Sequence, residues 1–238
     1  MTTPREACLE VLADAEATAA RARNIAVMAG FIDEDSIKAF GARRSNAEAI
    51  LDCRKLGFWT EEDLILDMTY GKGRFWKITG EPPHLWRGDL NPRRSPDFPE
   101  GLDATNTGLE DRSVEVAVCD PPYKLNGTPS GGGPASSDED YGVEGTRTMA
   151  QRHELMTAMC IEACRIANRR VIYKCQTQVC SGRKRNQVKM ILDTAEAHGF
   201  RFEDELFVEG HREQPSGRKQ RHAHQDFSSM LVLRRVGR

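Results

Sequence analysis

One short string places reactive groups where a strand should end. The apolar run from Val114 to Cys119 predicts a buried strand, and the letters "DPPY", Asp120 to Tyr123, follow it directly. Two consecutive prolines fix the backbone and cannot continue a helix or a central strand. Open α/β sheets bind ligands at the carboxyl ends of their strands. We therefore expect this string to hold an ionisable carboxylate and an aromatic ring rigidly at a ligand-binding edge.

With proline at about 5% of residues, such a string should arise by chance in on the order of one chain in a thousand of this length. It resembles the catalytic motif of the S-adenosylmethionine-dependent amino-methyltransferases, which modify the exocyclic N6 of adenine or N4 of cytosine. The resemblance implies that the Asp120 carboxylate and the Pro121 carbonyl accept hydrogen bonds from the amine. It also implies that Tyr123 stacks on a base turned out of the duplex, with Pro122 completing the rigid turn. A rigid turn with a packed tyrosine is the alternative.

An earlier stretch, "LILDMTYGKGRFW", has the form expected of a cofactor loop. Its apolar run ends at an acid, and the two glycines after it permit close approach of the backbone to a ligand. It resembles the donor loop of the same family, an acidic residue followed by Phe-x-Gly-x-Gly, with tyrosine in place of phenylalanine. The resemblance implies contacts to S-adenosylmethionine from Asp67, Thr69, Tyr70, Gly71 and Gly73.

Two further acids lie between the loop and the DPPY string. Asp89 comes 18 residues after Gly71, near the usual distance of about 20 for an acid that binds ribose hydroxyls. Asp103 fits a third loop, which in this family lies against the adenine of the donor. The short interval before Asp89 requires a first helix that is very short or irregular. Each acid alone could equally be a surface carboxylate, so the assignment depends on their order.

Two other nucleotide sites are excluded by pattern. A phosphate-binding loop would need GxxxxGK[ST], which is absent, and a dinucleotide site would need a glycine where Trp76 stands.

The elements that must position these residues follow from the apolar runs. Short runs separated by helices or loops predict an α/β fold, a Rossmann-like methyltransferase sheet with parallel strands. The runs "FRFEDELFVEG" and "FSSMLVLRR" predict an antiparallel hairpin at its edge. Helices are predicted over about 4–24, at 35–40 and from about Asn46, which caps the last one before Gly57 ends it. We therefore expect a helical N-terminal segment, 1–60, packed on a methyltransferase domain, 61–238.

Three stretches of that domain are predicted to be loops. Residues 126–146 are rich in Gly, Ser and Pro and are expected to form a mobile loop, which could act as a lid or simply as a linker. The segments 181–187 and 211–224 are polar and basic. Two histidines of the second segment, His222 and His224, are expected to contact phosphates or to be exposed.

The charge distribution is uneven. Residues 165–238 hold 16 Lys and Arg against 8 Asp and Glu, a balance of +8, and the formal net charge of −2 leaves −10 for the remainder. A polyanionic partner explains this, although a solvated surface would have the same composition. Lys174 is a candidate nucleic-acid-binding residue that is expected to face the same cleft as the catalytic strand. The candidate phosphate contacts are Arg183, Lys184, Arg185, Arg218, Lys219 and Arg221.

Composition limits the location and the metal chemistry. No run is long enough to span a bilayer, and the first 24 residues do not form a secretory signal, so we expect a cytoplasmic protein without a membrane partner. The seven cysteines include no CxxC pair. They are therefore expected to be reduced thiols, with no metal site.

The resulting hypothesis is an enzyme that methylates N6 of adenine in DNA. An N4-cytosine enzyme, an RNA base methyltransferase and a non-catalytic nucleic-acid-binding module with a methyltransferase-like sheet stay open. Methylation of a protein glutamine is disfavoured, because those enzymes usually carry asparagine at the position of Asp120. The chain is expected to have no room for a separate recognition domain, so recognition of a short sequence, low specificity, a homodimer or a helper protein are the alternatives.

Overall fold

The computed structural model describes residues 37, 41–125, 148–210, 222–223 and 225–237. The chain divides into two units, 1–38 and 39–238, and everything below concerns the second. The predicted helix over 4–24, the loop 126–146 and the residues Arg218, Lys219, Arg221 and His224 lie outside the described part.

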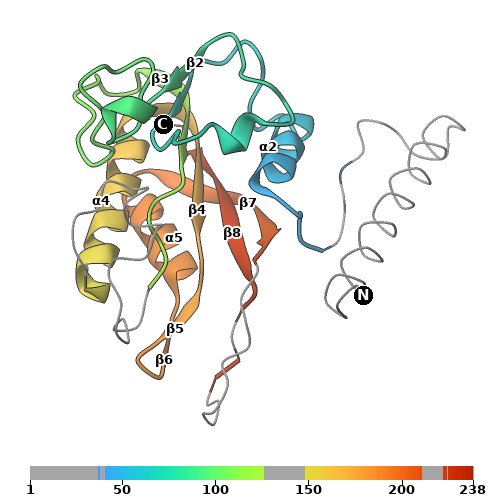
Figure 1. The fold of residues 1–238 in the computed structure, drawn as a ribbon, viewed down its shortest axis with the longest axis vertical. Helices are drawn as coiled ribbons and strands as arrows, with labels where there is room; N and C mark the ends of the chain where they lie inside the picture. The colour runs from blue at the N-terminus through green and yellow to red at the C-terminus, as the bar shows by residue number, and fades with distance from the viewer. Residues whose placement is uncertain (1–36, 38–40, 126–147, 211–221, 224, 238) are drawn as a thin grey trace, which may run out of the picture. The chain divides into compact units, whose positions relative to one another are not determined.

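A six-stranded sheet forms the centre of the fold, with the strand order β2-β1-β3-β4-β8-β7. The elements are α2 (Asn46–Lys55), β1 (Ile65–Asp67), η1 (Arg74–Trp76), β2 (Leu85–Arg87), η2 (Pro92–Arg94), β3 (Val114–Cys119), α4 (Met149–Ile166), β4 (Ala167–Cys175), β5 (Gln178–Cys180), β6 (Arg183–Arg185), α5 (Gln187–Ala197), β7 (Phe200–Glu209) and β8 (Phe227–Arg235). Strands β2, β1, β3 and β4 are parallel, whereas β8 runs antiparallel to both β4 and β7. The predicted α/β class and the antiparallel edge pair are confirmed (Figure 1).

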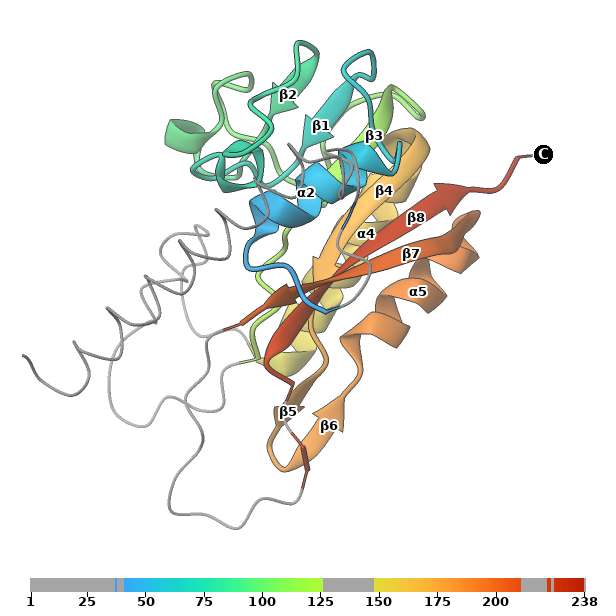
Figure 2. The same cartoon turned by 90° about the vertical axis from the view of Figure 1, so that its right-hand side faces the viewer.

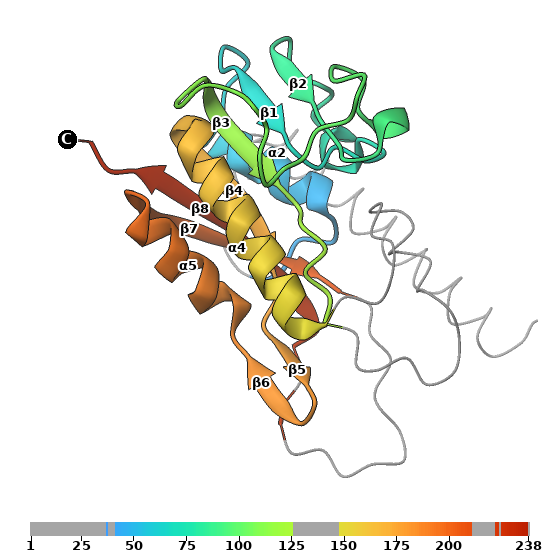
Figure 3. The same cartoon turned by 90° about the vertical axis from the view of Figure 1, so that its left-hand side faces the viewer.

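Helices cover both faces of the sheet. In Figure 3, α4 and α5 lie in front of the strands, whereas Figure 2 shows α2 on the opposite face. Strand β3 faces both layers: Ala117 and Cys119 pack with α4, and Val116 and Val118 pack with α2 and η1. A register irregularity follows Val114 and leaves it on the α4 side. All five side chains are fully buried, which explains why the strand reads as a continuous apolar run.

The strand order reverses between β1 and β3. The chain passes from β1 outward to β2 and later from β3 outward to β4 in the other direction, so β1 and β3 flank a topological switch point. Open α/β sheets bind ligands at such a point. Asp67 ends β1 and pairs in register with Val118 of β3. This pairing brings the loop after β1 beside the DPPY string.

The segment before helix α2 is tied to the edge strand β7. The Arg43 N–H donates to the Phe207 carbonyl at 2.7 Å, and the Glu209 N–H donates to the Arg43 carbonyl at 2.8 Å. Ser45, and not the predicted Asn46, is the N-cap, because its hydroxyl accepts from the Glu48 N–H. Gly57, at φ +72°, follows the end of the helix as predicted.

The predicted basic loop 181–187 is instead a β-hairpin followed by the start of α5. Strands β5 and β6 pair in antiparallel register around Ser181 and Gly182. Both turn residues have positive φ, +51° and +71°, as a two-residue type I′ turn requires. The Ser-Gly pair was a turn signal. It marks the reversal of a short hairpin, which projects beyond the carboxyl end of β4 (Figure 1).

Candidate active site

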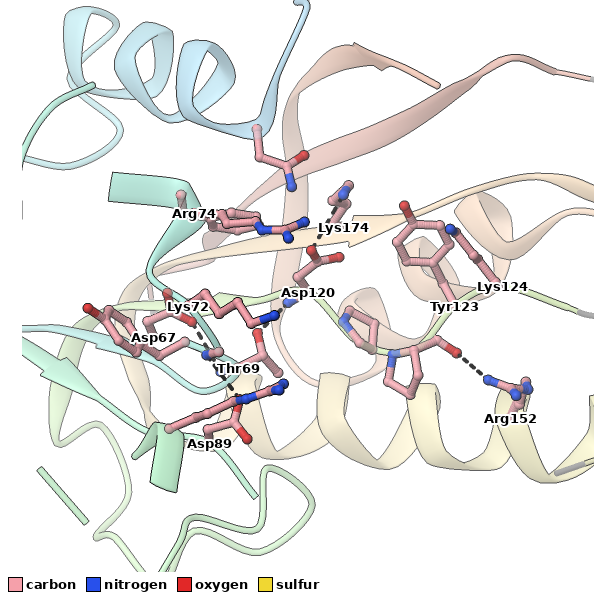
Figure 4. A pocket seen from close by; sticks show the side chains of 17 residues that line it. Asp67, Thr69, Lys72, Arg74, Asp89, Asp120, Tyr123, Lys124, Arg152 and Lys174 are labelled. Carbon is pink, nitrogen blue, oxygen red and sulfur yellow. Dashed lines mark hydrogen bonds and ion pairs between the residues drawn. The ribbon is translucent and has the colours of Figure 1, made fainter. Parts of the chain in front are cut away.

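Asp120 lies directly after β3, where the end of this strand meets the loop after β1 and the end of β4 (Figure 4). Its backbone N–H donates to the Thr69 hydroxyl at 2.7 Å. One carboxylate oxygen, Oδ2, lies 3.4 Å from the Lys174 Nζ at the end of β4. The other, Oδ1, is buried and has no hydrogen-bond partner among the described residues. A buried acceptor without a partner is costly, so a ligand that donates to Oδ1 would remove that cost.

The backbone of the DPPY string is held from several directions. The Pro121 carbonyl accepts from the Tyr123 N–H at 2.7 Å, and the Pro122 carbonyl accepts from the Arg152 Nη1 at 3.4 Å. The Tyr123 carbonyl accepts from the side-chain amides of Gln178 and Gln187, at 2.7 and 2.9 Å. These bonds make the string a rigid support for Asp120. Sequence reasoning missed Arg152 and both glutamines, because no local pattern marks them.

Lys174 lies at the end of β4 and faces the cleft beside Asp120, as its place on the strand next to the catalytic strand predicted. It is 7% exposed, and its Nζ lies 5.2 Å from the centre of the Tyr123 ring as well as beside Asp120. Burial lowers the pKa of Lys174, but the charge of Asp120, with a smaller effect from Tyr123, outweighs burial and raises the pKa above its usual value. Lys174 is thus a charged residue of the site itself. Burial also raises the pKa of Tyr123, so its hydroxyl stays protonated near neutral pH.

Asp67 lies on the other side of the switch point and is almost fully buried. Its Oδ2 accepts from the Trp76 Nε1 at 2.9 Å, and its Oδ1 accepts from the Thr69 N–H at 3.1 Å. Burial raises the pKa of Asp67 to about 7, although both hydrogen bonds oppose this. Trp76 was not predicted as a site residue. It belongs to η1, the three-residue helix that follows the glycines, so the predicted shortness of the first helix is confirmed.

Asp89 closes the loop after β1. Its Oδ2 accepts from the Gly71 N–H at 3.0 Å, and its Oδ1 accepts from the Asn91 N–H at 2.8 Å. Burial raises the pKa of Asp89 against the effect of these two N–H groups. The structure therefore brings Asp89 and the glycine loop together, as their spacing predicted.

These acids line one connected space. A cavity of about 310 Å³, which we call the inner cavity, is lined among others by Asp67, Gly71, Asp89, Asp120 and Tyr123. A smaller hollow of about 60 Å³ adjoins it and shares Thr69, Asp89 and Pro122 with it. Its lining is mainly apolar: Met68, Leu90, Leu102, Ala104, Pro122, Leu155 and Met159, with Thr105 and the predicted Asp103. The site thus combines a polar cavity with an apolar hollow.

The ring of Tyr70 covers the turn of the glycine loop. Its hydroxyl donates to the Glu81 carboxylate, and the Arg87 guanidinium lies 6.0 Å from the ring centre. Gly73, at φ +64°, lies directly beneath: a Cβ placed there would be 2.7 Å from the tyrosine Oη. Gly80, at φ +74°, has no atom within 4 Å of a Cβ placed on it.

Gly73→Ala is therefore expected to displace Tyr70 and weaken ligand binding in the inner cavity, whereas Gly80→Ala is the matched control. Both substitutions strain a left-handed backbone at a cost on the order of 1 kcal/mol, but only the first creates a steric overlap. We expect the affinity of Gly73→Ala for S-adenosylmethionine, measured by calorimetry, to be about tenfold lower than that of Gly80→Ala. Equal affinities of the two variants would contradict the prediction.

The other predicted basic residues lie away from this cavity. Arg183 and Lys184 are exposed and Arg185 is half-buried on the β5–β6 hairpin, and the His222 ring bonds the Gly182 carbonyl at 3.0 Å. Across the part of the chain that the structure describes, no group of three or more His, Cys, Asp or Glu side chains could hold a metal ion. None of the described helices is both long enough and apolar enough to cross a membrane.

Comparison with known proteins gives distant structural similarities only. No protein-family model matches the chain, and no curated protein matches it. A Thermus thermophilus protein assigned as a DNA modification methylase aligns at 18% identity and TM-score 0.36, over 57% of this chain and 51% of that one, about half its length. A Pyrococcus horikoshii protein assigned as an RNA methyltransferase aligns at 15% identity and TM-score 0.48, over 80% and 83% of the two chains.

A third solved structure, the magnesium protoporphyrin IX methyltransferase of Synechocystis with bound SAH, aligns at 11% identity and TM-score 0.47, over 80% of this chain and 82% of that chain. With identities this low, the chemistry of this chain has to come from the geometry of its own residues.

Proposed function

We propose that this chain is an S-adenosylmethionine-dependent methyltransferase that acts on the exocyclic amine of a flipped base, with N6 of adenine in DNA as the preferred target. One observation carries the proposal. Asp120, whose buried Oδ1 has no hydrogen-bond partner among the described residues, lines the same inner cavity as the glycine loop and its two acids. An acceptor for an amine and a candidate cofactor site therefore adjoin each other.

The residues around the glycine loop fit the parts of the methyl donor. Asp67 offers a carboxylate to its cationic amino group, and Asp89 offers one to its ribose hydroxyls. The apolar hollow beside Asp103 fits its adenine ring. Gly71 and Gly73 leave room for close approach of the backbone. When bound, S-adenosylmethionine supplies an electrophilic methyl group on a sulfonium.

Asp120 has to make a poor nucleophile reactive. The lone pair of an exocyclic amine is delocalised into the base, and hydrogen bonds accepted from its N–H groups localise it on nitrogen. Asp120 Oδ1 is free to accept one such bond, and the Pro121 carbonyl keeps a second lone pair beside the one that Tyr123 uses. The carboxylate also stabilises the positive charge that develops on the amine. The Tyr123 ring provides a face on which the base can stack.

Adenine is preferred over cytosine because aspartate in the first position of the motif leans toward adenine within the family that the string resembles. The test is transfer of label from tritiated donor to unmethylated plasmid DNA and, in parallel, to RNA. Digestion to nucleosides then identifies the product. Labelled N6-methyladenine in DNA supports the proposal, whereas labelled N4-methylcytosine or labelled RNA would replace the target. Binding of DNA without any label would favour the non-catalytic module.

A further inference from the structure

A second cavity, of about 660 Å³, opens beside the inner cavity, and we call it the outer cavity. The two cavities share the lining residues Asn46, Arg74, Tyr123, Lys124 and Lys174. Both volumes lie within the range of about 300–1,000 Å³ that is typical of ligand sites. One molecule can therefore extend across both, with one group against Asp120 and the rest in the outer cavity.

Cations dominate the lining of the outer cavity. The five are Arg44, Arg74, Lys77, Lys124 and Lys174, and the acid among the lining residues is Glu209. Arg44 pairs with Glu48 and Lys174 pairs with Asp120. The other three are exposed and form no ion pair with any residue that the structure describes. Clustered cations without acidic partners repel one another, so their grouping favours an anionic ligand.

The three cations come from the two segments that build the reaction site. Arg74 begins η1 and Lys77 follows the last residue of η1, directly after the glycine loop, whereas Lys124 follows Tyr123. In the view of Figure 4, Arg74 and Lys124 lie to either side of Lys174; all three residues line both cavities. Ile78, which is 51% exposed, adds an apolar surface to the same lining.

We propose that the outer cavity binds the DNA strand next to the target nucleotide, with Arg74, Lys77 and Lys124 contacting the flanking phosphates. This inference rests on the proposed function, because it takes the target base to lie against Asp120. A flipped base stays linked to a phosphate on each side, so cations are needed within about one nucleotide of the reacting amine. A small amine or a free nucleoside would bring no charge to these three side chains. The substrate class is therefore a polynucleotide.

A pair of double variants tests these contacts. Lys77→Gln/Lys124→Gln removes two of the cations. Lys189→Gln/Arg201→Gln removes two charges from a surface hollow formed by α5 and β7. Binding of a fluorescent DNA duplex is measured by anisotropy over a range of salt concentrations. We expect the first double variant to bind about tenfold more weakly at low salt, with a salt slope reduced by about 1.8, or about 0.9 for each lost phosphate contact. The control double variant should match the wild type.

The outcomes separate this inference from the proposed function. Equal salt slopes for the two double variants would overturn the phosphate contacts, even if the wild type methylates DNA. Tighter, salt-dependent binding of RNA than of DNA would overturn DNA as the occupant. Absence of methyl transfer from the wild type to any nucleic acid, with a reduced slope in the first double variant only, would overturn the proposed reaction and support the cavity as a DNA site.

Discussion

Replacement of Asp120 by alanine is expected to slow methyl transfer to DNA by about 10²–10³-fold, the usual cost of losing one preorganised electrostatic group. The variant loses the free Oδ1 that would accept from the amine and the charge that would stabilise it. Donor binding should persist, because the bond from the Asp120 N–H to Thr69 involves the backbone and is kept. Single-turnover rates measured with labelled donor, beside calorimetry of donor binding, check both statements.

The controls for this variant follow from the neighbours of the carboxylate. Alanine leaves the buried Lys174 ammonium without its partner, so thermal unfolding is measured for every variant to exclude a folding defect. Asp120→Asn keeps an acceptor oxygen and the side-chain volume while removing the charge. We expect it to retain more activity than the alanine variant. A folded alanine variant with an undiminished rate would remove Asp120 from the reaction.

The features that sequence predicted are those encoded locally. The apolar run before Asp120, the two prolines after it and the glycines after Asp67 each specify their own backbone, so the strands, the turn and the loop follow from neighbouring residues. The meeting of Gly71 with Asp89 could also be predicted, because it depends on a short chain interval. The antiparallel edge pair followed from two β-rich runs separated by a polar stretch.

The missed features depend on contacts between distant parts of the chain. The inner cavity joins Asn46 of α2 to Lys174 of β4, and nothing near either residue marks the other. Gln178 and Gln187 hold the Tyr123 carbonyl across 55 and 64 residues. The strand order predicted that Lys174 faces the cleft, but its burial and its ion pair with Asp120 could not be predicted from neighbouring residues. Tertiary structure here decides which cation faces the solvent and which faces Asp120.

The affinity for S-adenosylmethionine is expected to fall by roughly fiftyfold between pH 7 and pH 5, because Asp67 has to be ionised to pair with the donor's amino group. Burial raises the pKa of Asp67 to about 7, so below that pH the carboxyl must release a proton on binding. Above about pH 8 the donor's own α-amino group loses its charge. The affinity should therefore be highest between about pH 7 and 8.

Calorimetry in buffers of different ionisation enthalpy measures this proton directly. About one proton should be released for each donor bound at pH 6. Asp67→Asn should bind weakly, with no loss of affinity toward acid pH and no proton release. If the asparagine variant released the same proton on donor binding, that proton would come from another group.

Stability without donor provides an independent check on Asp67. Its pKa in the folded chain, about 7, lies above the ordinary value of 3.8, so the folded state holds the proton more tightly than the unfolded state does. The stability that this group contributes is therefore complete below about pH 4 and is lost as the pH rises through 7, at up to about 1.4 kcal/mol per pH unit.

The free energy of unfolding in urea is measured for the wild type and for Asp67→Asn, and the difference between the two isolates the contribution of Asp67. That difference should shift against the wild type as the pH rises from 4 to 7, and it should then stay constant. A difference that is constant over the whole range would show that Asp67 is already ionised in the folded chain, and the acid dependence of donor binding would then have no source in this residue.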